Sequence, residues 1–155
     1  MGYDLRAVIA ERGLLAAVTA DVSAARLVDV RHGLALLPMT GALSDALTDA
    51  ARPRRTAFWS LPPGFDDVLA EWSRTGSVAY AEAEYFGGVG EENAAVWRDG
   101  ELVLGPLHLA EGEPAPAGGS PVCQVLRALG VHAGQEDEFT AVGLGEHRDN
   151  EGWLR

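Results

Sequence analysis

The segment from Val78 to Phe86, Val-Ala-Tyr-Ala-Glu-Ala-Glu-Tyr-Phe, is the clearest strand in the chain and decides how the other elements are arranged. Successive side chains of a strand point to opposite faces of a sheet. One face therefore carries Val78, Tyr80, Glu82, Glu84 and Phe86, and the other carries Ala79, Ala81, Ala83 and Tyr85. Small alanine side chains let a helix pack closely, so we expect the helices on the alanine face and both glutamates on the face away from them.

Two turns after this strand predict an antiparallel meander. The stretch from Gly87 to Gly90 is typical of a tight loop between strands, because glycine adopts positive φ angles freely. Asp99-Gly100 lies between two apolar segments and is a strong signal for a two-residue hairpin. The register set by this turn pairs Arg98 with Glu101 and Trp97 with Leu102.

The N-terminal side of the meander alternates between strand and helix patterns. We expect a strand over residues 3–9, a helix over 11–20, a hairpin over 26–30 and 34–37, and a helix over 41–51. The polar stretch from Arg52 to Arg55 is expected to be a solvated loop. The clearest helix follows, with one apolar stripe formed by Phe65, Val68, Leu69 and Trp72.

The C-terminal side adds a further helix. Ser120 is a typical N-cap, Pro121 suits the first helical position, and Gly130 is expected to end the helix. Residues 139–144 are expected to form a last short strand. The order of elements predicts an α+β fold: a mainly antiparallel sheet with four to five helices packed largely on one face, as a single domain over residues 1–155.

Length and composition narrow the class of protein. The 155 residues suffice for a real core. No apolar run approaches the roughly 20 residues that span a bilayer, so we expect no membrane association. Cys123 is the only cysteine, which excludes a disulfide within the chain. We expect no signal peptide and a cytoplasmic location.

Charge is distributed unevenly along the chain, whose formal net charge is -11. Residues 1–60 are nearly balanced, with 7 arginines against 6 acids, whereas residues 61–110 carry 2 arginines against 9 acids. Such a surface repels phosphate backbones, so nucleic-acid binding is not expected. It attracts a basic protein and speeds the encounter. The alternative that acidity only keeps the protein soluble stays open.

Two sequence features invite a catalytic interpretation. The glycines from Gly87 to Gly90 follow a strand, but no helix comes after them, and Glu91 and Glu92 repel a phosphate there. Glu82 and Glu84 lie two apart on one strand face and could act as acid and base or bind a divalent cation. No further metal ligands follow from the spacing. We therefore predict no catalytic residue, metal or cofactor, and keep a small enzyme or ligand-binding module as the alternative.

The stretch from Ala79 to Gly90, followed by Ala94-Ala95-Val96-Trp97, carries a resemblance. It resembles small uncharacterised bacterial proteins, mostly actinobacterial, with a Tyr-Phe-Gly-Gly-x-Gly segment before an Ala-rich strand. Some proteins of this style look like immunity proteins that neutralise polymorphic toxins. The resemblance covers about residues 78–105 and implies no catalytic residues. Related segments often carry Gln where this chain has Glu91-Glu92-Asn93.

These observations favour a protein-binding role over catalysis. We expect an immunity-type inhibitor, an antitoxin that caps a basic toxin or effector domain through an acidic surface. Charged residues provide a fast association rate and aromatic residues provide anchoring. The expected interface consists of Trp59, Tyr80, Glu82, Glu84, Tyr85, Gly87, Gly88, Gly90, Glu91 and Glu92. A structural accessory protein that forms a homodimer is a further alternative.

Overall fold

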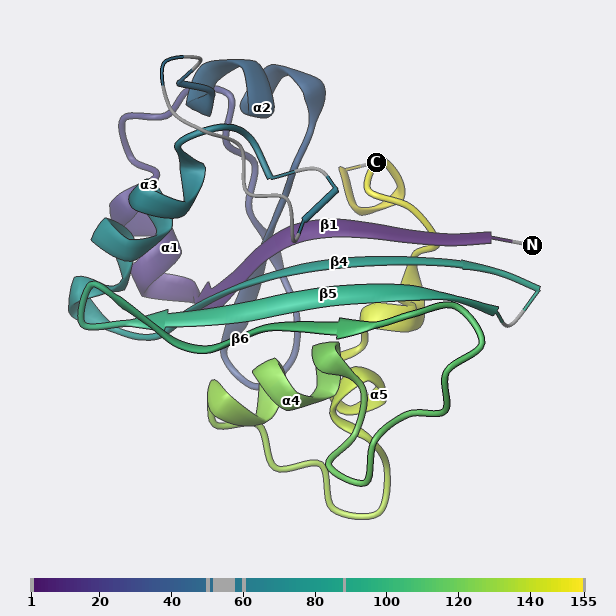
Figure 1. The fold of residues 1–155 in the computed structure, drawn as a ribbon. Helices are drawn as coiled ribbons and strands as arrows, with labels where there is room; N and C mark the ends of the chain where they lie inside the picture. Colours follow the sequence, from purple (N-terminus) through teal and green to yellow (C-terminus); the bar gives the residue numbers. More distant parts are fainter. Residues whose placement is uncertain (1, 50, 52–57, 60, 88, 155) are drawn as a thin grey trace.

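The structure is a computed structural model that describes residues 2–49, 51, 58–59, 61–87 and 89–154. The loop expected from Arg52 to Arg55 lies outside the described residues. The strands are β1 (Gly2–Glu11), β2 (Val28–Asp29), β3 (Leu34–Pro38), β4 (Val78–Phe86), β5 (Val89–Arg98) and β6 (Glu101–Leu109) (Figure 1). The helices are α1 (Arg12–Val18), α2 (Gly41–Leu47), α3 (Phe65–Trp72), α4 (Pro121–Ala128) and α5 (Glu138–Val142). Short 3-10 turns cover Ser73–Thr75, Leu144–Glu146 and Gly152–Leu154.

The strands form one antiparallel sheet in the order β2-β3-β1-β4-β5-β6. The predicted strand β4 lies in the middle and pairs along its whole length with β1 and β5. The predicted second hairpin is confirmed, with Arg98 opposite Glu101 and Trp97 opposite Leu102. Its turn residues have φ angles of 54° at Asp99 and 82° at Gly100, the positive values that a type I′ turn requires.

Helices cover both faces of the sheet. On the face that carries Tyr80, here called the Tyr80 face, a core forms with α1, α2 and α3. On the opposite face, the Ala81 face, a second core forms with α4 and α5 (Figure 1). The α+β class, the antiparallel sheet and the number of helices are confirmed. The expectation that the helices lie largely on one face is wrong, because the strands carry apolar side chains toward both faces.

The segment expected to be a last strand is a helix instead. Asp137 caps α5 by accepting a hydrogen bond from the backbone N–H of Thr140 at 2.8 Å. Gly143 ends the helix with a φ of 89°, in the left-handed region that favours glycine. Ala141 and Val142 pack into the core on the Ala81 face. A short apolar run fits either structure, and the two caps decide for a helix.

One end of the sheet extends beyond the helices that cover the Tyr80 face. Figure 1 shows β1, β4 and β5 running past α1–α3 toward the N-terminus of the chain. Burial follows the same boundary, because β4 is buried from Val78 to Ala83 and Glu84 is the first exposed residue. The adjoining hairpin end is exposed at Phe86 and Val89. The sheet therefore presents an uncovered end on the Tyr80 face. None of the helices in the described ranges has the length and hydropathy of a membrane-spanning segment.

Candidate functional site

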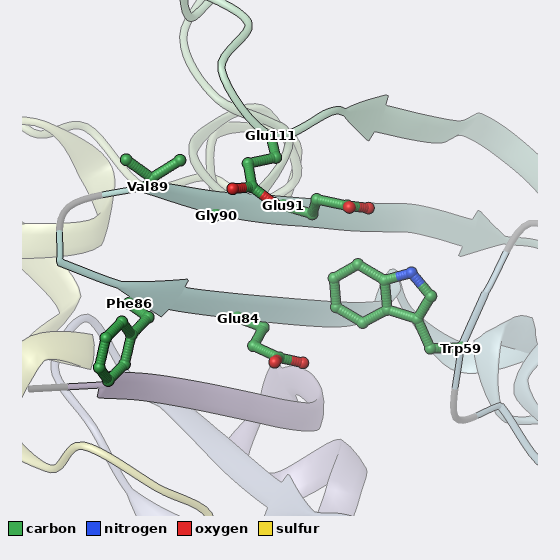
Figure 2. A pocket seen from close by; sticks show the side chains of 7 residues that line it. All are labelled: Trp59, Glu84, Phe86, Val89, Gly90, Glu91 and Glu111. Carbon is green, nitrogen blue, oxygen red and sulfur yellow. The ribbon is translucent and has the colours of Figure 1, made fainter.

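The uncovered end of the Tyr80 face contains a pocket of about 380 Å³. It is here called the acidic pocket, and it is lined by Trp59, Glu84, Phe86, Val89, Gly90, Glu91 and Glu111. Figure 2 shows the indole of Trp59 at one end and the side chains of Phe86 and Val89 at the other. Glu84 lies on one side, and Glu91 and Glu111 lie on the other. Three carboxylates and an aromatic ring thus surround one concave surface.

Strand register places the carboxylates of the pocket. Glu84 on β4 lies opposite Glu91 on β5, and Asp4 on β1 lies opposite Glu84 from the other side. This row of like charges across three strands is unfavourable by itself, because directly opposite like charges repel. Asp4 is offset by an ion pair with Arg6 at 2.8 Å. Among the described residues, no arginine or histidine lines the acidic pocket, although Arg6 and Arg148 line an adjoining pocket that shares Glu84 and Phe86 with it.

The apolar end of the pocket consists of side chains at the β4–β5 turn. Phe86 and Val89 lie opposite each other and are 76% and 46% exposed. These values are high for large apolar side chains, and the two residues adjoin the carboxylates directly. The pocket therefore combines carboxylates with exposed apolar surface.

Glu82 lies on the same strand face as Glu84 but is fully buried. One carboxylate oxygen accepts the backbone N–H of Trp59 at 2.7 Å, and the other accepts the hydroxyl of Tyr80 at 3.0 Å. The expectation that Glu82 is displayed outward is therefore wrong. The Tyr80 ring is also fully buried and packs edge to face on Phe58. Glu82 and Tyr80 hold the segment that carries Trp59 against the sheet.

A cation lies near this buried carboxylate. Arg6 on β1 lies opposite Glu82. Its pKa is raised above the ordinary value, first by its hydrogen bond to Asp4 and then by the charges around it, including Glu82, although burial opposes the shift. Arg6 also lines, with Arg148 and Glu84, a neighbouring pocket on the same sheet end, so its positive charge lies between the two glutamates and Asp4.

The carboxylate pair expected for the enzyme alternative is separated by the fold. Glu84 lines the acidic pocket, whereas Glu82 is not among the residues that line it. The carboxylate of Glu82 accepts hydrogen bonds from Trp59 and Tyr80. An acid and base that share a substrate must face the same cavity. This arrangement does not provide that pair.

Glu92 lies on the opposite face of the sheet from the pocket, and only 6% of the residue is exposed. It accepts the backbone N–H of Val122 in the first turn of α4 at 2.9 Å and the hydroxyl of Tyr85. Burial, and then the hydrogen bond and charge of Glu92, raise the pKa of Tyr85. The expected display of Glu92 toward a partner is therefore wrong. Its carboxylate joins the sheet to α4, where the positive end of the helix favours a negative charge.

The glycines of the β4–β5 turn have two different roles. Gly87 adopts a φ of 62°, which an L side chain rarely adopts. Gly90 lies within β5, where a Cβ atom would come 1.9 Å from the backbone oxygen of Glu84. Gly88 lies outside the described residues. Gly87 therefore forms the turn, and Gly90 permits the close approach of the two strands that form the floor of the pocket.

A buried amide lies next to the pocket along β5. Asn93 is the next residue after Glu91 on the Tyr80 face, lies opposite Glu82 and is 2% exposed. Its Oδ1 lies 2.7 Å from Nδ1 of His108, which is on β6. Its Nδ2 is buried, and no hydrogen-bond partner for it is found within the described part of the chain. The Nδ2 donor of Asn93 is thus buried without an acceptor in the part of the chain that the structure describes.

A second pocket lies on the Ala81 face and holds about 440 Å³. It is lined by Tyr3, Tyr85, Glu92, Ser120, Cys123, Asp137, Phe139 and Gly145. Cys123 is free and 5% exposed, in the first turn of α4. Within the described ranges, no group of three or more histidine, cysteine or acidic residues is arranged to hold a metal ion.

Of the ten residues expected in an interface, the structure brings four to the acidic pocket: Trp59, Glu84, Gly90 and Glu91. Sequence reasoning missed three lining residues. Phe86 and Val89 could have been found, because strand alternation places Phe86 on the face of Glu84 and the turn places Val89 opposite it. Glu111 could not, because it follows β6 in a loop whose path depends on the whole sheet.

Comparison of the chain with protein-family models, with curated proteins and with solved structures finds no match. The acidic pocket offers three carboxylates, one indole and exposed apolar side chains on an uncovered sheet end. These groups can attract a cation and pack against apolar atoms.

Proposed function

We propose that this chain is a protein-binding module of the immunity type, which caps a basic toxin or effector domain with the acidic pocket and the sheet end around it. The observation that carries the proposal is the row of like charges at Glu84 and Glu91, joined by Glu111, without an arginine or histidine among the described lining residues. A basic partner would relieve this repulsion when it binds.

Electrostatics supports the proposal at long range as well. The formal net charge of -11 creates a negative potential around the whole chain, and low-dielectric walls concentrate it in concave sites. Steering of this kind raises the association rate of a basic partner and depends strongly on ionic strength. A toxin must be neutralised before it acts, so a fast association rate is the property that an inhibitor needs most.

The exposed apolar side chains supply the short-range part of the interaction. Phe86 and Val89 lie at one end of the pocket and Trp59 at the other, so apolar contacts flank the charges on both sides (Figure 2). Aromatic residues supply most of the binding energy in many interfaces. The same charges oppose a homodimer formed through this face, because two copies would bring like charges together.

The genomic neighbourhood provides the first test. The proposal expects the gene directly upstream to encode a large secreted protein with a basic C-terminal domain. That domain, produced with an inactivating substitution, is the probe for binding. Calorimetric titration at low and at physiological ionic strength should show an affinity that falls as salt is added. An affinity that ignores ionic strength would count against electrostatic capture.

A matched pair of variants localises the binding. The triple variant E84Q/E91Q/E111Q removes three charges from the acidic pocket, and D21N/E101Q/E136Q removes three exposed charges elsewhere. We expect the first to lower the association rate about tenfold or more and the second to lower it much less. Equal losses would mean that net charge, and not this pocket, governs the encounter.

A further inference from the structure

We propose, resting on the function above, that the acidic pocket receives one arginine side chain of the partner, whose guanidinium lies between the indole of Trp59 and the carboxylates of Glu84, Glu91 and Glu111. The proposed function asks only for a basic surface. A single arginine side chain, recognised by these four residues, is the more specific requirement.

The carboxylates that line the acidic pocket indicate that its ligand is positively charged. Glu84 and Glu91 lie opposite each other on neighbouring strands, and Glu111 lies beside Glu91 across the pocket (Figure 2). Carboxylates at such spacing repel one another, and a cation between them turns this repulsion into attraction. The arginine nearest in register, Arg6, is bonded to Asp4 at 2.8 Å and does not line this pocket.

The shape of the ligand follows from the indole. Trp59 is held by its own backbone N–H on the fully buried carboxylate of Glu82, at 2.7 Å. This bond places the backbone of Trp59, and its ring lies at the end of the pocket (Figure 2). A planar guanidinium stacks on such a ring and still points its five N–H groups at carboxylates. An ammonium is a compact, strongly hydrated charge that gains less from this geometry, so arginine is favoured over lysine.

The size of the pocket suits one side chain. Its volume of about 380 Å³ lies near the lower end of the roughly 300–1,000 Å³ found for ligand pockets. Phe86 and Val89 at the far end are exposed and can pack on the apolar stem of an arginine and on neighbouring residues. The same two side chains can also contact residues of the partner that lie outside the pocket.

The amide of Asn93 adds an independent feature. It lies one side-chain position beyond Glu91 on the same face, opposite the residue that holds Trp59. Only one end of this buried amide is bonded, to His108. The amide therefore keeps one buried polar atom without a partner in the row that continues from Glu91, although it does not itself line the pocket.

Three blocked tripeptides of glycine, with arginine, lysine or citrulline in the middle, test the proposal. They are titrated into the full ¹⁵N-labelled chain and followed by nuclear magnetic resonance, with the indole signal of Trp59 assigned through W59F. We expect the arginine peptide to shift this indole signal and the amides of Gly90 and Glu91 in a saturable way. Lysine should bind at least about fivefold more weakly, and citrulline, which has the shape without the charge, should not bind.

Substitutions complete the test. E84Q and E91Q should each weaken binding of the arginine peptide about tenfold, whereas E101Q, at the far end of β6, should leave it unchanged. Equal binding of the arginine and lysine peptides, or the absence of a saturable shift, overturns the inference. If the upstream toxin domain binds but W59F and the peptides show no effect, the proposed function stands without it. If the arginine peptide binds and the toxin domain does not, the pocket's chemistry stands and the immunity role falls.

Discussion

The fully buried carboxylate of Glu82 accepts the backbone N–H of Trp59 at 2.7 Å. A residue expected to face a partner instead holds the aromatic residue that lines the acidic pocket. The same carboxylate accepts the hydroxyl of Tyr80 at 3.0 Å, so the pocket's end is tied to the core beneath it.

Replacing Glu82 with glutamine should destabilise the chain. The amide nitrogen of glutamine cannot accept a hydrogen bond, so either the Trp59 N–H or the Tyr80 hydroxyl loses its acceptor. We expect a loss of about 1–3 kcal/mol in the free energy of unfolding, measured by urea denaturation. E84Q is the matched control, because Glu84 is exposed, and it should change stability by less than about 0.5 kcal/mol. Similar values for the two variants would contradict the assigned anchoring role.

Replacing Trp59 with alanine should weaken binding of the basic partner about thirtyfold or more, as expected for an aromatic anchor. The ring is only partly buried, so its removal should change the unfolding free energy less than E82Q does. The measurement is calorimetric titration with the upstream toxin domain. Val103, which is 49% exposed and does not line the pocket, provides the control variant V103A. A loss of affinity in V103A equal to that in W59A would place the interface elsewhere.

Alanine at position 90 should disrupt the hairpin that forms the pocket floor. Its Cβ would lie 1.9 Å from the backbone oxygen of Glu84, so the two strands must move apart. We expect a loss of about 2 kcal/mol or more in thermal or urea unfolding. G41A is the control, because no atom lies within 4 Å of a Cβ there and alanine favours the helix. A G90A variant as stable as G41A would show that the strands are not this close.

Alkaline pH should destabilise the contact between Tyr85 and Glu92. Burial and the hydrogen bond to Glu92 raise the pKa of Tyr85 in the folded chain above its ordinary value of about 10. The folded protein holds this proton more tightly than the unfolded chain does. The stabilisation is therefore complete below about pH 10 and is lost as the pH rises through the folded-state pKa.

The variant Y85F measures this contribution. At neutral pH it should be less stable than the natural chain by about 1–3 kcal/mol, because the buried carboxylate of Glu92 loses a donor. Above about pH 10 the difference should shrink, since phenylalanine has no proton to lose. Urea unfolding over a pH series gives the difference in unfolding free energy at neutral pH and above about pH 10. If the unfolding free energies of Y85F and the natural chain change in parallel with pH, the hydroxyl of Tyr85 does not donate a hydrogen bond to Glu92 in the folded protein.

Sequence reasoning was most successful where structure is local. The period-two pattern from Val78 to Phe86 and the Asp99-Gly100 turn define β4 and the second hairpin, because strand alternation and turn chemistry act over a few residues. The segment from 139 to 144 failed because a run this short fits helix and strand equally. The signal that decides it lies in the capping residues Asp137 and Gly143.

The burial of Glu82 and Glu92 could not be predicted from local patterns. Glutamate is rarely fully buried, so a strand pattern with glutamates indicates a solvated face. Here the donors come from Trp59 and Val122, which are 23 and 30 residues away along the chain. Only the packing of these segments on the two sheet faces creates the partners. Four of the seven residues that line the acidic pocket were predicted. Phe86 and Val89 follow from strand alternation, whereas Glu111 does not.

In the proposed function, the uncovered end of the Tyr80 face is the surface that docks a basic protein. Hydrogen exchange of the chain, alone and with the inactivated upstream toxin domain, tests it most directly, because it maps contact without altering any charge. The account predicts slower exchange in residues 84–91 and around Glu111, with little change in α4 and α5. Protection confined to α4 and α5, or to the opposite end of the sheet at Asp99-Gly100, would contradict it.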